Sequence, residues 1–380
     1  MTDRSGTSWV RGLLEFAAIG LAVGGGWVLF AGQIERTVAL GPRGFEMGLI
    51  YWPPYGLDTP TDIASKGVGL TLENSEHILV QIPWSPADLS AVDTAAWMAG
   101  VARAHNHGLT ISLDWMDSDR GGLRAVGAEP WSFADPAVAD RYVDELVTCA
   151  QRYAPQYLLL GVEVDFLARS DPQEFGHFVA LYERTYRAVK EAAPETKVTV
   201  SFQLEAQVAS MEAGEHLLEA GPVVAFGPLL DVLALSVYPC QVAGHPGALP
   251  PDYLSSVLPQ PKPVGIFETG WPSGSSGEQA QADYTAWLMA AATSVPLEVL
   301  VWSSTTDLGS VAQEDPQPGA VACSGSVSDW NGTLGMWGID GSAKPASQQW
   351  QRWLRSAARV TVAEEGATAD RIDPAARPLY

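Results

Sequence analysis

Short apolar runs alternate with longer stretches of helical periodicity along most of this chain. Eight such runs occur in order, and they lie at residues 46–54, 77–84, 109–117, 157–165, 197–205, 231–239, 263–272 and 297–305. Apolar runs of strand length that are separated by helical stretches are typical of βα units, which build a parallel sheet. Eight units within residues 45–358 predict an α/β fold, a (β/α)₈ TIM barrel.

The stretches between the runs carry helix signals. The stretch after the fourth run begins with Asp171 as a predicted N-cap and Pro172 at the first helical position. Residues 346–360 would form the eighth helix, which closes the cycle. An open doubly wound sheet is the alternative fold. It is disfavoured because the first run leads into YWPPYG (51–56) and not into a glycine-rich phosphate-binding turn.

The N-terminal segment has a different pattern. Residues 16–32, FAAIGLAVGGGWVLFAG, carry no charge and follow Arg4 and Arg11. A helix of this length reaches about 26 Å, close to the ~30 Å hydrocarbon core of a bilayer. Without a small-x-small cleavage site before Gln33, we expect an uncleaved signal-anchor helix whose N-terminus faces the cytoplasm. A cleaved signal peptide and a buried core helix remain the alternatives.

These patterns divide the chain into four parts. They are a cytoplasmic stub with the anchor helix (1–35), a linker (36–44), the barrel (45–358) and a polar C-terminal tail (359–380). We expect the barrel to lie outside the cytoplasm, either tethered to the membrane or secreted. The composition is acidic, with 44 Asp and Glu against 22 Lys and Arg. This balance argues against a nucleic-acid partner, which requires a basic surface.

Carboxylates and aromatic side chains gather at the predicted C-terminal ends of the strands, which form the active-site face of such a barrel. The residues at these ends are Trp52, Trp84, Asp114, Trp115, Glu163, Asp165, Glu205, Tyr238, Glu268, Trp271 and Trp302. Aromatic faces stack on sugar rings, and carboxylates bind hydroxyls and transfer protons. The combination favours a glycan-binding site. The alternative is that the aromatics only close the barrel core and that one or two carboxylates belong to salt bridges.

Two glutamates, one on the fourth and one on the seventh strand, resemble the signature of glycoside hydrolase clan A, the retaining (β/α)₈ glycosidases. The motif FETGWPSG (267–274) resembles the nucleophile motif of family 17 endo-β-1,3-glucanases and, less closely, that of family 53 endo-β-1,4-galactanases. The segment LGMWGIDGSAKPA (334–346) is similar to the last turn before the closing helix of such barrels. The resemblance covers residues 45–358.

The resemblance implies a retaining hydrolase that acts on a β-linked polysaccharide or oligosaccharide without a cofactor or a metal. It assigns the acid/base to Glu163, the nucleophile to Glu268, the residue that holds the nucleophile to Tyr238 and the floor of the sugar subsite to Trp302. A retaining mechanism places the two carboxyls about 5–5.5 Å apart. It also calls for a raised pKa at Glu163, the general acid.

One position departs from the pattern. Clan members carry asparagine before the acid/base, where it binds the sugar 2-hydroxyl, and this chain carries Val162. Asp165 or Asp114 could take over that contact. The alternative function is a catalytically silent glycan-binding barrel in a cell-envelope or polysaccharide-export assembly.

The three cysteines fit an extracytoplasmic protein. Cys149 falls within a helical pattern, where a buried thiol is expected. Cys240 and Cys323 fall in the loops after the sixth and eighth strands, where they could form a disulfide if their Cα atoms lie within about 7 Å. The sequence contains no Cys/His spacing typical of zinc sites, no H-E-x-x-H and no G-x-S-x-G motif, so we expect no metal centre and no serine-hydrolase site.

Overall fold

The computed structural model describes residues 43–50, 61–117, 120–125, 130–210, 217–219, 221–258, 262–308 and 332–356. The chain divides into two units, residues 1–42 and 43–380, and the description below concerns the second. The predicted anchor helix, most of the linker and the tail lie outside the described residues. Within the described ranges, no helix has the length and apolar character needed to cross a bilayer.

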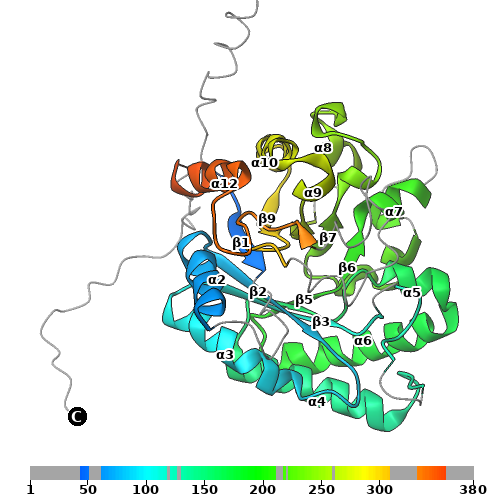
Figure 1. Ribbon diagram of the computed structural model, residues 1–380. Helices are drawn as coiled ribbons and strands as arrows, with labels where there is room; N and C mark the ends of the chain where they lie inside the picture. The colour runs from blue at the N-terminus through cyan, green and yellow to red at the C-terminus, as the bar shows by residue number, and fades with distance from the viewer. Residues whose placement is uncertain are drawn as a thin grey trace, which may run out of the picture. The chain divides into compact units, whose positions relative to one another are not determined.

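A parallel sheet forms the centre of the molecule (Figure 1). Its strands are β1 (Glu46–Ile50), β2 (His77–Pro83), β3 (Gly108–Asp114), β4 (Tyr157–Leu159), β5 (Lys197–Thr199), β6 (Ser201–Gln203), β7 (Leu233–Val237), β8 (Val264–Thr269) and β9 (Leu297–Trp302). Their order is β5-β4-β3-β2-β1-β9-β8-β7-β6. The two outermost strands, β5 and β6, follow each other along the chain with only Val200 between them.

The sheet therefore curves round until its edges meet at one interrupted strand, and this nearly closed parallel barrel fits a TIM barrel. All eight predicted runs contain strands, the fifth run supplying both β5 and β6. The lumen is packed with side chains. Tyr157 of β4 and Phe267 of β8 belong to strands that are not neighbours, yet their ring centroids lie 5.2 Å apart.

Helices alternate with the strands. They are α2 (Thr61–Glu73), α3 (Ala91–Ala104), α4 (Pro136–Tyr153), α5 (Asp165–Ser170), α6 (Pro172–Ala192), α7 (Leu204–Ser210), α8 (Tyr253–Val257), α9 (Ser273–Ser276), α10 (Glu278–Ala292) and α12 (Pro345–Ser356). The predicted start of α6 is confirmed, since the Asp171 side chain accepts a hydrogen bond from the Glu174 amide at 3.0 Å. The closing helix is α12, which packs against α10.

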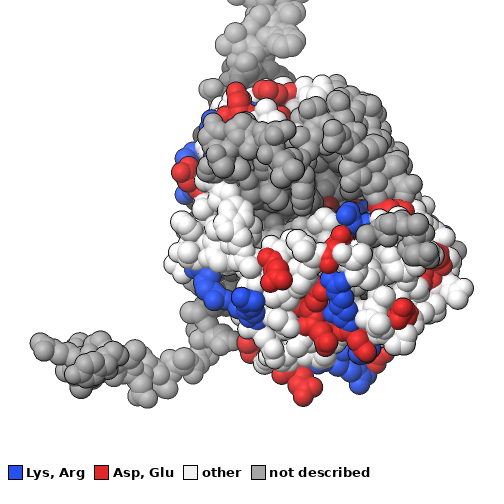
Figure 2. All heavy atoms as spheres, turned by 60° about the horizontal axis from the view of Figure 1, so that its bottom comes forward, with Lys and Arg blue, Asp and Glu red and all other residues white. Residues whose placement is uncertain are grey.

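The amino-terminal ends of the strands carry polar contacts of their own, one buried and one half-buried. His77 Nδ1 lies 2.9 Å from Glu46 Oε2, and Lys197 Nζ lies 2.6 Å from Glu298 Oε1. These contacts tie neighbouring and opposite strands together at the end of the barrel that usually serves stability. On the outer surface, the face in Figure 2 carries basic and acidic side chains interspersed.

Candidate active site

Glu268 owes its orientation to an irregularity in β8. Along the β7–β8 ladder, Leu235 pairs with Ile266 but the next residue, Ser236, pairs with Glu268, so Phe267 is an extra residue. Successive side chains of a regular strand face opposite sides, and a bulge re-aims the residues that follow it. Phe267 can therefore enter the barrel core while Glu268 still faces the carboxyl end of the lumen.

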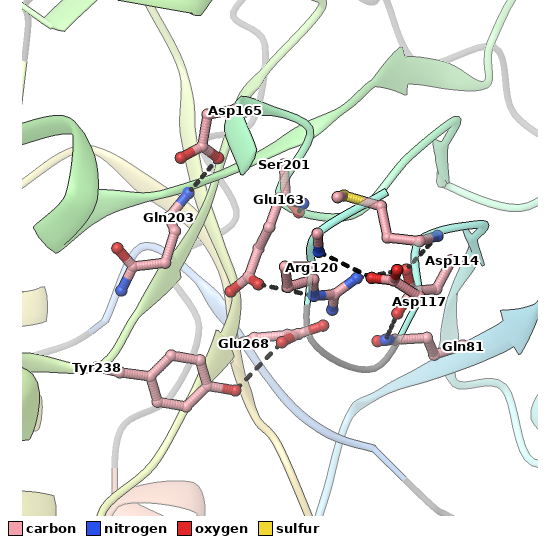
Figure 3. A network of polar contacts seen from close by, with 12 residues as sticks. Gln81, Asp114, Asp117, Arg120, Glu163, Asp165, Ser201, Gln203, Tyr238 and Glu268 are labelled. Carbon is pink, nitrogen blue, oxygen red and sulfur yellow. Dashed lines mark hydrogen bonds and ion pairs between the residues drawn. The ribbon is translucent and has the colours of Figure 1, made fainter. Parts of the chain in front are cut away.

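Tyr238, directly after β7, holds Glu268. Its hydroxyl lies 3.1 Å from Glu268 Oε2, to which it donates a hydrogen bond, and 2.7 Å from Ser303 Oγ at the end of β9. Tyr238 and Glu268 are both buried. The contact that the resemblance implies for these two residues is therefore present (Figure 3).

Glu163 follows β4 in a strained backbone conformation. Its φ is 49°, in the left-handed region that costs a non-glycine residue roughly 1–3 kcal/mol. The conformation is fixed by a hydrogen bond from the Glu163 amide to Ser201 Oγ at 2.9 Å and by Gly161, where a Cβ would lie 2.7 Å from Val164 Cγ1. Strain of this kind is common at functional sites.

Arg120, in the loop after β3, connects the carboxylates of the site. Its Nη1 lies 2.5 Å from Asp114 Oδ1 and its Nε lies 3.3 Å from Glu163 Oε2. Figure 3 shows Arg120, Glu163 and Glu268 converging from three separate parts of the chain. The sequence analysis missed Arg120. Its signal was a single arginine at the end of a segment with three aspartates, DWMDSDR (114–120).

Burial dominates the electrostatics of the pair. It raises the pKa of Glu163 and that of Glu268 above the usual range of a glutamate, and the charge of Glu163 is the second cause at Glu268. The charge of Arg120 lowers both pKa values, and the charge of Asp114 raises both. Two such carboxyls lose their protons in separate steps, so the pair holds a single proton over a range of pH. One ionised and one protonated carboxyl is the state from which retaining hydrolysis begins.

The remaining carboxylates lie around the pair. Asp114 at the end of β3 binds Arg120 and accepts from Gln81 Nε2 at 3.2 Å. Asp165 is fully buried, accepts from the Gln203 amide at 3.0 Å and pairs with Arg169 at 3.0 Å.

Glu205, which follows β6, supports the chain around Tyr238. It accepts hydrogen bonds from the Tyr238 amide at 3.0 Å, the Gln203 side chain at 2.7 Å and the Tyr253 hydroxyl at 3.1 Å. Burial raises its pKa to about 7. Glu205 and Asp165 are thus engaged by backbone and side-chain partners that position the site, and their carboxylates are not part of the pair.

Trp84 and Trp115, two of the tryptophans predicted to stack on sugar, make their contacts elsewhere. Trp84 donates its indole N–H to Glu145 of α4 at 3.0 Å, and Trp115 donates to the Leu160 carbonyl at 2.9 Å. Both rings are buried among aromatic side chains of the helix layer, such as Tyr142 and Phe178. The alternative in which aromatics close the barrel core does not describe these two residues either, since both rings pack against helices.

Trp302 and Trp271 also pack outside the lumen. Trp302 donates to the Leu334 carbonyl at 2.8 Å, and its ring lies 6.4 Å from that of Trp350 on α12. Trp271 lies 5.2 Å from Tyr284 on α10. The predicted sugar floor at Trp302 is not found, because strand alternation turns Trp302 toward the helices while its neighbour Ser303 reaches Tyr238. Trp52 lies outside the described residues.

The predictions for the cysteines are confirmed in part. Cys149 is a free, buried thiol, and burial raises its pKa to about 12. Cys240 is disulfide-bonded. Cys323 lies outside the described residues, so its pairing with Cys240 stays a prediction. Within the described part of the chain, no group of three or more His, Cys, Asp or Glu is placed to hold a metal ion.

The solved structures to which this fold is similar include glycoside hydrolases. A GH5_18 structure from Streptomyces cattleya in complex with GlcNAc is 16% identical, with a TM-score of 0.61 over 83% of this chain and 80% of that one. A GH5_18 structure from Bifidobacterium longum is 15% identical, with a TM-score of 0.60 over 81% and 78%. The exo-β-1,4-mannosidase Op5Man5 from an Opitutaceae bacterium is 18% identical, with a TM-score of 0.57 over 83% of this chain and 60% of that one.

At this level of identity the likeness establishes the fold. The chain has the fold of clan A glycoside hydrolases. The sequence itself matches no model of a known protein family and no curated protein. A further structural neighbour, a fungal β-1,4-galactanase, fits the second family resemblance, at 16% identity and a TM-score of 0.52. The resemblance to family 17 stays a prediction.

Proposed function

We propose that this protein is a retaining glycoside hydrolase that cleaves β-linked glycans, with Glu268 as nucleophile and Glu163 as general acid/base. The observation that carries the proposal is the buried pair itself. Two glutamates from the carboxyl ends of β4 and β8 share the charge of Arg120, and one of them is held by a tyrosine hydroxyl. The fold that the chain shares with glycoside hydrolases supports the same assignment.

The first half-reaction forms a covalent intermediate. An oxygen of Glu268 attacks the anomeric carbon while Glu163 gives its proton to the glycosidic oxygen, so the C–O bond to the leaving group breaks as the ester bond forms. Tyr238 suits this step because its donated hydrogen bond stabilises the ionised form of Glu268. Burial of Glu163 keeps that carboxyl protonated at a higher pH than an exposed glutamate.

The second half-reaction returns the enzyme to its first state. Glu163, now ionised, takes a proton from water, and the water oxygen attacks the anomeric carbon and displaces Glu268. Two displacements at one carbon retain its configuration. The contact of Arg120 with Glu163 stabilises the carboxylate that this step requires.

The neighbours support a proposal for the substrate class. One neighbour is a second Streptomyces cattleya complex that holds Manβ1-4GlcNAc, another is an exo-β-1,4-mannosidase and a third is a β-1,4-galactanase. We therefore propose a β-linked oligosaccharide or polysaccharide of neutral hexoses. An acidic protein of net charge −22 suits such a neutral substrate better than a polyanion.

Val162 favours the second candidate function, a silent glycan-binding barrel. It is buried, it carries no hydrogen-bonding group, and it occupies the position where the resemblance expects the asparagine that binds the 2-hydroxyl. Hydrogen bonds to that hydroxyl contribute several kcal/mol in the transition state. Without another donor, the barrel would bind glycans and turn them over slowly or not at all.

We further propose that the barrel works outside the cytoplasm, tethered through residues 16–32 or secreted. The disulfide at Cys240 supports this location, because disulfides persist in oxidising compartments. The apolar segment and its arginine-bearing flank support the tether.

A glycan panel separates the two candidate functions. The full chain and its Glu268→Ala variant are incubated with β-mannans, β-galactans, β-glucans and xylans, and released reducing ends and glycan affinity are measured. The hydrolase proposal expects release from at least one glycan by the wild type and none by the variant. No release on any glycan, with equal affinity of both proteins for one of them, contradicts it and favours the silent barrel.

A further inference from the structure

The proposed mechanism uses Arg120 only to stabilise ionised Glu163 in the second half-reaction, yet this cation also faces Asp114 and Glu268. It is 6% exposed, and it comes from a loop and not from a strand end. Its φ of 56° places its backbone in the left-handed region, as at Glu163. A buried guanidinium in a strained loop conformation needs partners that outweigh the cost of its desolvation.

Those partners are carboxylates from different elements. Asp114 at the end of β3 holds Nη1, and Glu163 after β4 lies against Nε. The charges of Asp114, Glu163 and Glu268 all stabilise the guanidinium. One cation thus faces three acidic side chains, and these can all be ionised only with an excess of two buried negative charges. Such an excess is costly in a medium of low dielectric.

The other groups around the pair do not relieve that excess. Asp165 on α5 faces Glu163 with the same sign of charge, and its own ion pair is with Arg169, 42% of whose side chain is exposed. Tyr238 after β7 donates a hydrogen bond to Glu268 and carries no charge, because burial holds its pKa well above the usual value. Among the residues that the structure describes, Arg120 is therefore the cation whose charge acts on both glutamates.

We propose that Arg120, held by Asp114, is a positioning residue that sets how many protons Glu163 and Glu268 carry, so that the pair keeps a single negative charge while the enzyme works. Arg120 acts through the two glutamates and not on the sugar. The inference rests on the proposed function for its use in catalysis, but the proton count is a property of the free protein. The charge of Asp114 has the opposite effect on the protonation of Glu163 and Glu268, because a negative charge opposes their ionisation.

The test is a titration of the two carboxyls without substrate. The full chain is labelled with ¹³C at the glutamate side-chain carboxyls, and their shifts are followed against pH, with Glu163→Gln and Glu268→Gln assigning the signals. Arg120→Met removes the cation and should raise the apparent pKa values by at least about one unit, a tenfold change in proton affinity. Arg120→Lys should restore values close to those of the wild type. Asp114→Asn should shift them in the opposite direction, downward.

The matched control is Arg124→Met. Arg124 lies four residues further along the same loop, where Nε is 3.7 Å from Asp88 Oδ2 and the side chain is 36% exposed. Its removal changes the net charge by the same amount but should leave the titration of the pair in place. Thermal melting of each variant establishes that it is folded. If Arg120→Met does not fold, Arg120→Lys and Asp114→Asn still decide the question.

Three results would overturn the proposal. They are unchanged titration in Arg120→Met, shifts of the same sign in Arg120→Met and Asp114→Asn, and a shift in Arg124→Met as large as that in Arg120→Met. Opposite shifts support it. The glycan panel is a separate measurement, so an inert enzyme whose carboxyls respond as described would remove the proposed function and leave the proton count established.

Discussion

The contact between Tyr238 and Glu268 predicts how much activity is lost without it and in which direction the pH profile moves. Tyr238→Phe removes only the hydroxyl, which donates to Glu268 Oε2 at 3.1 Å and lies 2.7 Å from Ser303 Oγ. A hydrogen bond to a charged group contributes roughly 1.5–3 kcal/mol, so kcat/KM should fall roughly 10- to 150-fold. The ring remains, so the packing around it changes little.

The pH profile of the same variant tests the direction in which the pKa of Glu268 shifts. The hydrogen bond from Tyr238 lowers the pKa of Glu268, so its loss raises that pKa. The nucleophile must be ionised to react. Activity therefore appears only above its pKa, and the acidic limb of kcat/KM should move to higher pH.

The assay uses an aryl β-glycoside of the sugar that the panel identifies, with kcat/KM measured across pH for both proteins. Tyr253→Phe is the matched control, because the Tyr253 hydroxyl also donates to a buried carboxylate, Glu205 Oε1 at 3.1 Å, outside the pair. It should change kcat/KM much less and leave the acidic limb in place. Unchanged kcat/KM in Tyr238→Phe, or a limb that moves to lower pH, would refute the assigned role of Tyr238.

Three further predictions concern the rest of the chain. Cys240 should be joined to Cys323, seen as one linked peptide pair by mass spectrometry without reduction; a free Cys323 contradicts this. The full chain should sediment with membranes through residues 16–32, whereas a mature N-terminus near Gln33 would indicate a cleaved signal. Gly161→Ala should lower the free energy of unfolding by about 1–3 kcal/mol, because its Cβ meets two side chains at 2.7 and 2.9 Å, and an unchanged melting temperature would show that the turn can adjust.

The sequence predicted the order of the strands and the ends at which Glu163 and Glu268 lie. Alternation of apolar runs with helical stretches is compatible with few folds, and the two glutamates lie near the ends of their runs. The interruption at Val200 was not visible, because a single unpaired residue leaves the apolar pattern unchanged.

The side of the sheet on which each tryptophan lies could not be predicted, for a different reason. The run LEVLVW (297–302) is buried on both faces of the sheet, so its pattern does not tell which residues point into the lumen. A shift by one residue exchanges Trp302 for Ser303 at the site. The same ambiguity hid the bulge at Phe267, which decides where Glu268 points.

Arg120 was missed because loops lack periodicity. Asp114 is close to Arg120 along the chain and Glu163 is distant, and the closed barrel brings the three together. Arg120 faces both Glu163 and Glu268, but it lies in a loop, so the strand patterns could not indicate it.

The central claim is a covalent intermediate on Glu268 with Glu163 as acid/base, and azide tests it most directly. Glu163→Ala is given an aryl β-glycoside with a good leaving group, whose departure needs little protonation, and azide is added in place of the activated water. The account predicts faster turnover with azide and a glycosyl azide of β configuration. Turnover that azide does not accelerate, or a product of α configuration, would contradict it.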